Sequence, residues 1–272
     1  RQVVDGKVRR PVAAVVYNFP PPASNGQPSL LSLSEVSIVF HEFGHALQHV
    51  LTVQNESAVS GINGIEWDAI EVASQFMEYW PEEDKHTLYS CARHHSTGEP
   101  LPQNTYEQLR KEHGFRQATM LNWQIYFGTV DLRLHESFAK GENTSAIEKE
   151  VAKEVLAVQA IPEARPLCTF SHIFAGDYAA GYYSYQWSKV LSADAFGAFD
   201  ESGGLEDATT LRKVGLRFAR TLLAMGGGRD PAKVFADFRG RAPSTEALLR
   251  YSGLSLTAMG ASAMPSFHSV HF

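Results

Sequence analysis

Apolar residues recur every three or four positions along most of the chain, which is the spacing of helices with one buried face. The pattern is most regular from about Gln103 onward, where few stretches alternate as strands do. It predicts helices over Tyr106 to His113, Phe115 to His135, Ser145 to Val158, Tyr182 to Phe199, Leu211 to Leu223, Pro231 to Phe238 and Ser244 to Tyr251. A segment with glycines around it, Arg165 to Tyr178, is expected to form a loop. The expected fold class is therefore mainly α.

Two further helices are expected in the first third of the chain. Ser32 precedes an apolar-periodic stretch and has Glu35 three residues later, which is the spacing of a capping box. A helix should begin there and run to about Leu51. After a loop that contains two glycines, a second helix is expected from about Trp67 to Tyr79, because Pro81 interrupts helical hydrogen bonding.

The two ends of the chain differ from its helical middle. Residues Arg10 to Phe19 are rich in β-branched and aromatic side chains and are followed by prolines, so they predict one strand, a small β element near the N-terminus. Residues Ser255 to Phe272 are small and polar without periodicity, which predicts a poorly ordered tail. The chain starts at Arg1 without an initiator methionine, so we expect one domain over residues 1–254, truncated at its N-terminus.

Composition narrows the classes of partner and compartment. The chain has 272 residues, and its hydrophobic content of 44% is enough for one large core. The net charge is −6 and the basic residues are scattered, so nucleic acid is not an expected partner. No apolar run approaches the roughly 18 residues of a membrane span. Cys91 and Cys168 have no metal-site or disulfide spacing, which favours a reducing compartment, the cytoplasm or an organelle interior. We expect a monomer.

The segment His41-Glu42-Phe43-Gly44-His45 is an H-E-x-x-H motif in the first expected helix. Positions four apart lie on one face of a helix, so both imidazoles can reach the same metal ion. The arrangement suits Zn²⁺, whose catalytic sites use three protein ligands and leave a fourth position for water or substrate. Glu42, next to a ligand, would face that water and act as the general base.

The third ligand is expected on the second helix. Glu71 is the candidate, because an antiparallel neighbouring helix could bring its carboxylate to the histidine pair. Glu66 and Glu78 are weaker candidates for the same position. Asp68, one turn before Glu71, could accept the remaining N–H of a ligand histidine and so fix its tautomer.

Four separated segments match one known family, and they do so in the same order. The first two are Phe40 to Leu47, around the metal motif, and Trp67 to Glu78; the others are Phe170 to Trp187 and Phe238 to Pro243. They resemble the thimet oligopeptidase family of zinc metallopeptidases and are closest to its oligopeptidase A branch. The third segment is similar to that family's glycine-rich substrate loop, and the fourth to its C-terminal signature. The resemblance covers nearly all of residues 8 to 254.

The resemblance implies a zincin-type helical catalytic domain with one Zn²⁺. His41, His45 and Glu71 would bind the metal. Glu42 would activate water, as the motif itself indicates.

The resemblance also assigns roles to four residues of the loop. Tyr185 is our first choice as the catalytic donor to the oxyanion and His172 our second, while Tyr178 and Tyr182 would bind the substrate backbone. A donor of this kind contributes about 2.7 to 4 kcal/mol to catalysis. Aromatic spacing alone would favour packing at the start of a helix instead.

Three departures from the family bear on function. Ala73 stands where the family usually has proline, which changes the rigidity of the helix after the third ligand. Asp177 replaces a glycine of the substrate loop, adding a carboxylate and stiffening the segment. The family's N-terminal half, which forms the opposite wall of a deep channel, is not part of this sequence.

These observations predict a zinc-dependent endopeptidase that hydrolyses internal bonds of short peptides. One alternative is a dipeptidyl carboxypeptidase, which would need a cationic group to hold the free carboxylate of its substrate, and the family's N-terminal half could supply that group. A second alternative is a zinc-binding fragment that has no activity without its partner half.

Overall fold

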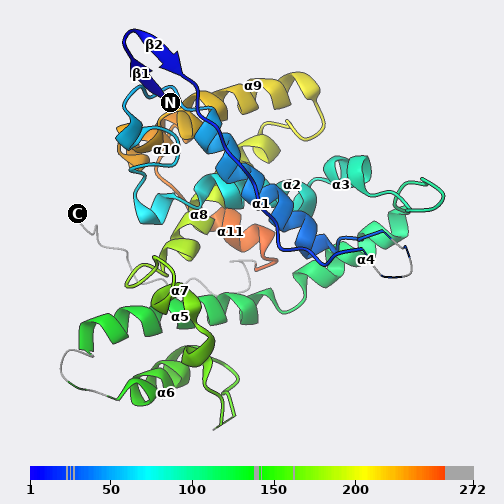
Figure 1. Cartoon of the computed structure of the whole chain (residues 1–272). Coiled ribbons are helices and arrows are strands. Elements are labelled where there is room, and N and C mark those ends of the chain that lie inside the picture. Colours follow the sequence, from blue (N-terminus) through cyan, green and yellow to red (C-terminus); the bar gives the residue numbers. More distant parts are fainter. Residues whose placement is uncertain are drawn as a thin grey trace.

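The computed structural model describes residues 1–254 except 23, 25, 27, 138–140, 142 and 162, and it is mainly helical (Figure 1). The tail predicted for residues 255–272 lies outside the described residues. The longer helices are α1 (Leu33–Val50), α2 (Val72–Glu83), α4 (Gln103–Gly114), α5 (Gln117–Ser137), α6 (Thr144–Val155), α8 (Ser184–Glu201) and α9 (Ala208–Phe218). The shorter ones are α3 (Lys85–Cys91), α7 (Ser171–Phe174), α10 (Pro231–Arg239) and α11 (Glu246–Tyr251). None of the described helices is both long and apolar enough to cross a membrane.

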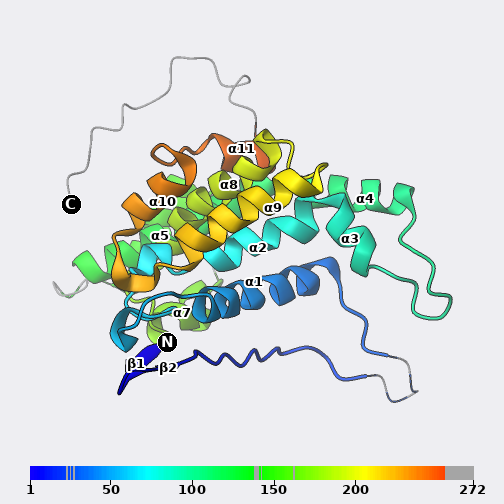
Figure 2. The same ribbon diagram turned by 90° about the horizontal axis from the view of Figure 1, so that it is seen from above.

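The strands lie at the very start of the chain. β1 (Gln2–Val4) pairs antiparallel with β2 (Lys7–Arg9), and Asp5 and Gly6 between them have φ values of 49° and 73°, as a tight hairpin turn requires. The strand predicted over Arg10 to Phe19 was wrong. Among the described residues no strand pairs with that segment, and Val12 and Val16 are 85% and 80% exposed. Figure 2 shows the segment running in extended form along the outer side of α1.

Helix α1 begins where the sequence predicted. The Ser32 side chain accepts a hydrogen bond from the Glu35 N–H, and the Glu35 carboxylate accepts one from the Ser32 N–H at 2.8 Å. This reciprocal cap satisfies two of the N–H groups that a helix start leaves free. The motif His41 to His45 consequently lies on a regular helix in the middle of α1.

Helix α2 differs from its prediction at both ends. A 3₁₀ turn, Trp67–Ala69, precedes it, and the helix itself starts at Val72. It continues through Pro81 to Glu83, because a proline near the last turn removes only one backbone hydrogen bond. The predicted loop over Arg165 to Tyr178 also contains the 3₁₀ turn Pro166–Thr169 and the short helix α7.

Gly44 sets the distance between α1 and α2. A Cβ atom at this position would lie 2.6 Å from the Ala73 carbonyl oxygen and 2.6 Å from Ser74 Cα, so only glycine permits the contact. The N-terminal end of α2 can therefore pass directly beneath the metal motif of α1.

Two hydrophobic cores flank this pair of helices. The larger core surrounds α8, where every residue from Leu191 to Phe199 is buried, and it includes residues of α2, α9, α10 and α11. The smaller core contains residues of α5 and α6. It also contains Phe170, which follows the 3₁₀ turn Pro166–Thr169, Ile173 of α7, and Tyr182. Helices α5 and α6 lie together at one end of the molecule (Figure 1). The predicted substrate loop, Phe170 to Trp187, runs from the smaller core to the start of α8.

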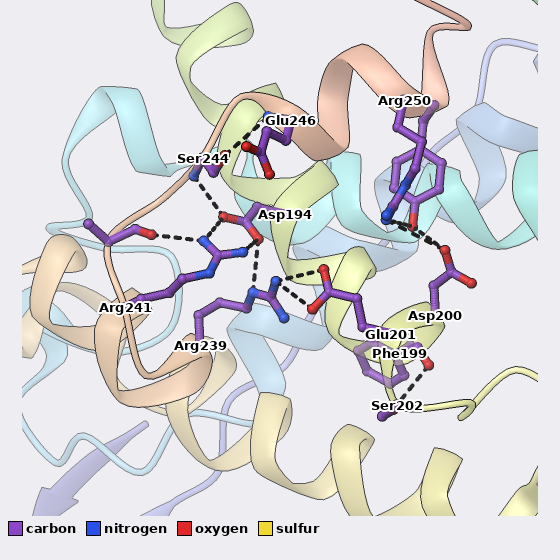
Figure 3. A network of polar contacts seen from close by, with 12 residues as sticks. Asp194, Phe199, Asp200, Glu201, Ser202, Arg239, Arg241, Ser244, Glu246 and Arg250 are labelled. Carbon is purple, nitrogen blue, oxygen red and sulfur yellow. Dashed lines mark hydrogen bonds and ion pairs between the residues drawn. The ribbon is translucent and has the colours of Figure 1, made fainter. Parts of the chain in front are cut away.

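A buried ionic network ties the end of the described chain to α8 (Figure 3). Asp194 is 0% exposed, and it accepts hydrogen bonds from Arg239 Nε at 2.8 Å, from Arg241 at 2.6 and 2.7 Å, and from the Ser244 N–H at 2.8 Å. The two arginines belong to the segment Phe238 to Pro243. In this structure the segment therefore fastens the end of the described chain to α8 through charge-assisted hydrogen bonds.

Candidate metal centre

Three of the predicted ligands meet at one point. His41 Nε2 and His45 Nε2 lie 3.3 and 3.2 Å from Glu71 Oε2, and the three ligand atoms are all within 4.8 Å of one another. Two imidazole nitrogens and one carboxylate oxygen are the donor set of many catalytic zinc sites. The residues present therefore fit a zinc ion, and His41, His45 and Glu71 are the side chains that would hold it.

The charges at this point suit a cation. Burial would raise the pKa of Glu71, but hydrogen bonds from His41 and His45 hold it well below its usual range. Burial lowers the pKa of His41, but hydrogen bonds and charge from Glu71 and Glu78 outweigh it and raise the pKa to about 10. A buried carboxylate thus stays negative beside two imidazoles, and a metal ion can replace the protons that they share with it.

Glu78 orients the first histidine. Its Oε1 lies 2.6 Å from His41 Nδ1, on the side of the ring opposite to Glu71. The role expected of Asp68 was therefore wrong for His41. For His45, the buried Nδ1 has no hydrogen-bond partner in the described part of the chain, so Asp68 does not reach it either. The backbone oxygen of Asp68 instead accepts a hydrogen bond from Ser188.

Glu71 is held by two hydroxyl groups. Tyr178 donates to Oε1 at 2.5 Å, and Ser74 donates to Oε2 at 2.8 Å. The carboxylate is 5% exposed, so these hydrogen bonds form away from bulk water and fix its orientation. Tyr178, predicted to bind substrate, thus contacts a predicted ligand in this structure.

Three aromatic rings form a column beside the ligands. The Tyr178 ring stacks on Trp67 at 4.9 Å and on Tyr185 at 4.7 Å between ring centroids. Gln75 of α2 donates a hydrogen bond of 3.1 Å to the Tyr185 carbonyl oxygen, which fastens the start of α8 to the helix that carries Glu71. Burial raises the pKa of Tyr185 to about 12, so its hydroxyl remains a donor at neutral pH.

The other two loop residues differ in exposure. The His172 side chain is exposed, and its ring lies 5.9 Å from that of Tyr185. Tyr182 is only 8% exposed, its ring packs in the smaller core, and its hydroxyl donates to Gln124 at 3.1 Å. The structure therefore brings Tyr178 and Tyr185 to the metal centre. His172 lies next to them, and Tyr182 is buried in the smaller core.

A groove of about 950 Å³ opens beside the centre. Its lining includes His41, Glu42 and Glu78, together with Ser32, Leu33, Ser34, Ser37, Ile38, Glu82, Leu109, Glu112 and His113. Glu42 thus faces open space next to a ligand, as its predicted role requires. No lysine or arginine is among these lining residues of the described chain.

Sequence reasoning gave no role to Ser74 and Gln75, and it ranked Glu78 only as a possible ligand. All three lie in the segment from Trp67 to Glu78 that carries the family resemblance. Their spacing from Glu71 could have suggested contacts on the same side of α2, because residues three, four and seven positions apart share a helix face.

Comparison with known proteins identifies the family of the chain. The family model described as peptidase family M3 matches residues 1–254. The chain belongs to peptidase family M3. Among curated M3 relatives, a probable cytosolic oligopeptidase A of Arabidopsis thaliana is 51% identical over 249 residues, which is 91% of this chain and 35% of that protein.

Two further M3 relatives bear on compartment and reaction. An organellar oligopeptidase A of Arabidopsis thaliana, chloroplastic or mitochondrial, is also 51% identical over 249 residues, covering 91% of this chain and 31% of that protein. A dipeptidyl carboxypeptidase of Salmonella typhimurium is 35% identical over 248 residues, covering 90% of this chain and 35% of that protein. The chain spans about a third of the length of the curated relatives it matches.

Proposed function

We propose that this chain carries the catalytic zinc site of an endopeptidase that hydrolyses internal bonds of short peptides. The observation that carries the proposal is the convergence of His41, His45 and Glu71 beside a groove that Glu42 lines. Zinc bound there would supply Lewis acidity, which makes a water molecule acidic and polarises the substrate carbonyl.

The protein's own groups would then act in a fixed order. Glu42 takes the proton of the attacking water and passes it to the leaving amine, as a general base and then a general acid. Tyr185 donates its hydroxyl proton in a hydrogen bond to the oxyanion that forms, with His172 as the second donor. These two assignments rest on the family resemblance and on the position of Tyr185 against Tyr178, which contacts Glu71, with His172 next to Tyr185.

Tyr178 and Tyr182 remain predicted to bind the substrate backbone. Because the Tyr182 ring is buried, its contribution would come through the loop it anchors. The Tyr178 hydroxyl already has a partner in Glu71, so contact with substrate would require a change of partner.

One comparison favours internal cleavage over the removal of C-terminal dipeptides. The two oligopeptidase A relatives are more similar to this chain than the dipeptidyl carboxypeptidase is. The relatives named cytosolic and organellar support a role in peptide turnover in the cytoplasm or an organelle.

The test is hydrolysis of a quenched, end-blocked peptide of about ten residues, a length that a concave site between lobes would admit. The zinc-loaded parent should cleave it at internal bonds, and Glu42→Gln should lower kcat by about 10²- to 10⁴-fold while still binding one zinc ion. Glu66→Gln, a neutralised exposed carboxylate outside the site, is the matched control and should retain activity.

Other outcomes identify the alternatives. Cleavage only after the C-terminal block is removed, with dipeptides as product, would identify a dipeptidyl carboxypeptidase. One zinc ion per chain without any turnover would identify a zinc-binding fragment that needs further chain for activity.

A further inference from the structure

A buried carboxylate outside the metal centre holds the predicted substrate loop by its backbone. Asp131 of α5 is 0% exposed. Its Oδ1 accepts a hydrogen bond from the Ala180 N–H and its Oδ2 one from the Tyr182 N–H, both at 2.9 Å. Each oxygen of one carboxylate therefore binds one amide of the turn that leads into α8. The metal site and the reaction described above make no direct use of this group.

The turn needs such a partner. Ala180 has a φ of 55°, a left-handed conformation that is unfavourable for residues with a side chain. The next residue, Gly181, lies so close to Trp67 that a Cβ atom would stand 3.2 Å from the indole ring. Two charge-assisted hydrogen bonds to Asp131 offset the cost of this conformation.

Asp131 is itself fixed from two sides. The His135 Nδ1, one helical turn later, lies 3.0 Å from Asp131 Oδ1 and 2.8 Å from the Asp131 carbonyl oxygen. The neighbouring Val130 and Leu134 are buried in the smaller core, where α5 packs on α6. A rigid helix thus presents the carboxylate to the loop at a constant position.

Two residues of the aromatic column, Tyr178 and Tyr185, depend on this turn. Tyr178 precedes the two bound amides and reaches Glu71, and Tyr185 follows them and lies beside Tyr178. A shift of the turn would move both rings relative to the ligands. An error of about 1 Å in the position of catalytic groups can cost about 10²-fold in rate.

We propose that Asp131 is a positioning residue, which acts through the turn at Ala180 and Tyr182 to hold Tyr178 and Tyr185 beside the metal centre. The catalytic consequence rests on the proposed function, whereas the hold on the backbone does not. His135 supports the carboxylate from the side of α5.

The test compares two buried carboxylates in the zinc-loaded full chain. Asp131→Asn keeps the size of the side chain but replaces one acceptor by an N–H₂ group that faces a backbone N–H. Asp194→Asn is the matched control, because Asp194 is equally buried and multiply hydrogen-bonded but lies in the separate network of α8 and α10. Both variants should lower the thermal unfolding temperature.

Five readouts separate positioning from stability. Asp131→Asn should lower kcat/KM on the end-blocked peptide by about 10- to 100-fold and weaken binding of a phosphinic peptide similarly. Binding of acetohydroxamate, which needs only the metal, and the zinc content should stay within about twofold. Hydrogen exchange at the Ala180 and Tyr182 amides should become faster by at least about tenfold, as expected when a buried hydrogen bond is lost. Asp194→Asn should leave all of these within about twofold.

A second variant keeps the proposal testable if Asp131→Asn does not fold. His135→Leu removes a side chain that is 40% exposed, so no buried cavity results. It should speed exchange at the same two amides and weaken phosphinic peptide binding in the same direction. Unchanged exchange and peptide binding in the folded variant would overturn the proposal.

Failure of the proposed function would look different. A parent chain that neither cleaves the peptide nor binds the phosphinic probe would overturn that function and the catalytic consequence of the hold. Amide exchange would still test whether Asp131 holds the turn. If the Ala180 and Tyr182 amides stay protected from exchange in Asp131→Asn, Asp131 does not hold them; if they lose protection, it does.

Discussion

The Tyr178 hydroxyl donates a hydrogen bond of 2.5 Å to Glu71 Oε1, which leaves Oε2 of that carboxylate facing His41 and His45. Tyr178→Phe removes this hydroxyl group, which also contacts that of Tyr185, and keeps the stacked ring. Partners that orient a metal ligand typically contribute 10- to 100-fold to affinity, so zinc affinity should fall by about tenfold. Competition with a chromogenic chelator measures it. Tyr183→Phe, at an exposed ring nearby, is the control, and an equal affinity in both variants would contradict the role given to Tyr178.

Glu78 should matter for the metal although it is not expected to bind it. Its contact of 2.6 Å with His41 Nδ1 sets the tautomer that leaves Nε2 free for zinc. Glu78→Gln should therefore weaken zinc binding by about 10- to 100-fold, measured by the same competition. Glu66→Gln, at an exposed carboxylate outside the group of His41, His45 and Glu71, should bind zinc like the parent. If Glu78→Gln lost its zinc completely, Glu78 would have to be a ligand.

Gly44→Ala tests the close approach of α1 and α2. The new Cβ would overlap the backbone of Ala73 and Ser74, so the helices must separate. Overpacking of this kind costs about 1–3 kcal/mol of unfolding free energy, and zinc affinity should fall as well, because the ligands come from both sides of the contact. Gly215→Ala is the control, since its Cβ would meet only Phe199 at 4.0 Å. Urea unfolding of both variants gives the comparison, and equal midpoints would contradict the role of Gly44.

Glu82 predicts a pH dependence of stability. Burial raises the pKa of its carboxyl from 4.5 to about 7, which means that the folded protein favours the neutral form. The stability that this raised pKa contributes to the folded protein is fully present below pH 4.5 and is lost as the pH rises through about 7. Glu82→Gln should therefore gain stability relative to the parent at pH 8, by at most about 3 kcal/mol, and little at pH 4.5.

The measurement for Glu82 is urea unfolding at the two pH values with EDTA present, so that zinc binding adds no pH dependence of its own. Ser37, which donates to Glu82 at 2.9 Å, can donate to glutamine equally well. Glu112→Gln, at an exposed residue of the same groove, should show no such difference. If the difference in unfolding free energy between the parent and Glu82→Gln were the same at both pH values, the raised pKa of Glu82 would be refuted.

The parts of the fold that could be predicted are those set by local sequence. Ser32 and Glu35 form the cap that their spacing indicates, and the metal motif lies on one helix face because its histidines are four residues apart. The strand predicted over Arg10 to Phe19 was wrong for the complementary reason. Its residues have strand propensity, but a strand also needs a partner, and the local sequence carries no information about one.

The site divides in the same way. His41 and His45 could be proposed from motif spacing, and Glu71 from its place on the next predicted helix and from the family resemblance. The structure brings the three side chains together. The contact between Glu78 and His41 and the hold of Asp131 on the loop join segments that are distant in sequence. Glu78 could be suspected from its place on the same side of α2 as Glu71. Asp131 gives no signal until the helices are packed, since an isolated Asp on a helix is usually a solvated surface residue.

The Asp194 network also constrains the order in which the chain can fold during synthesis. Its carboxylate lies on the central helix, but its partners Arg239 and Ser244 are made 45 and 50 residues later. A buried carboxylate without a partner is strongly destabilising. Asp194 of α8 therefore stays in contact with water until Arg239 and Ser244 have been made. A nascent chain that ends before Arg239 therefore holds the complete set of zinc ligands on a scaffold that is not yet able to close. Helix α11 and the segment Phe238 to Pro243, which are made after the helices that carry the ligands, therefore complete the scaffold that holds the metal centre.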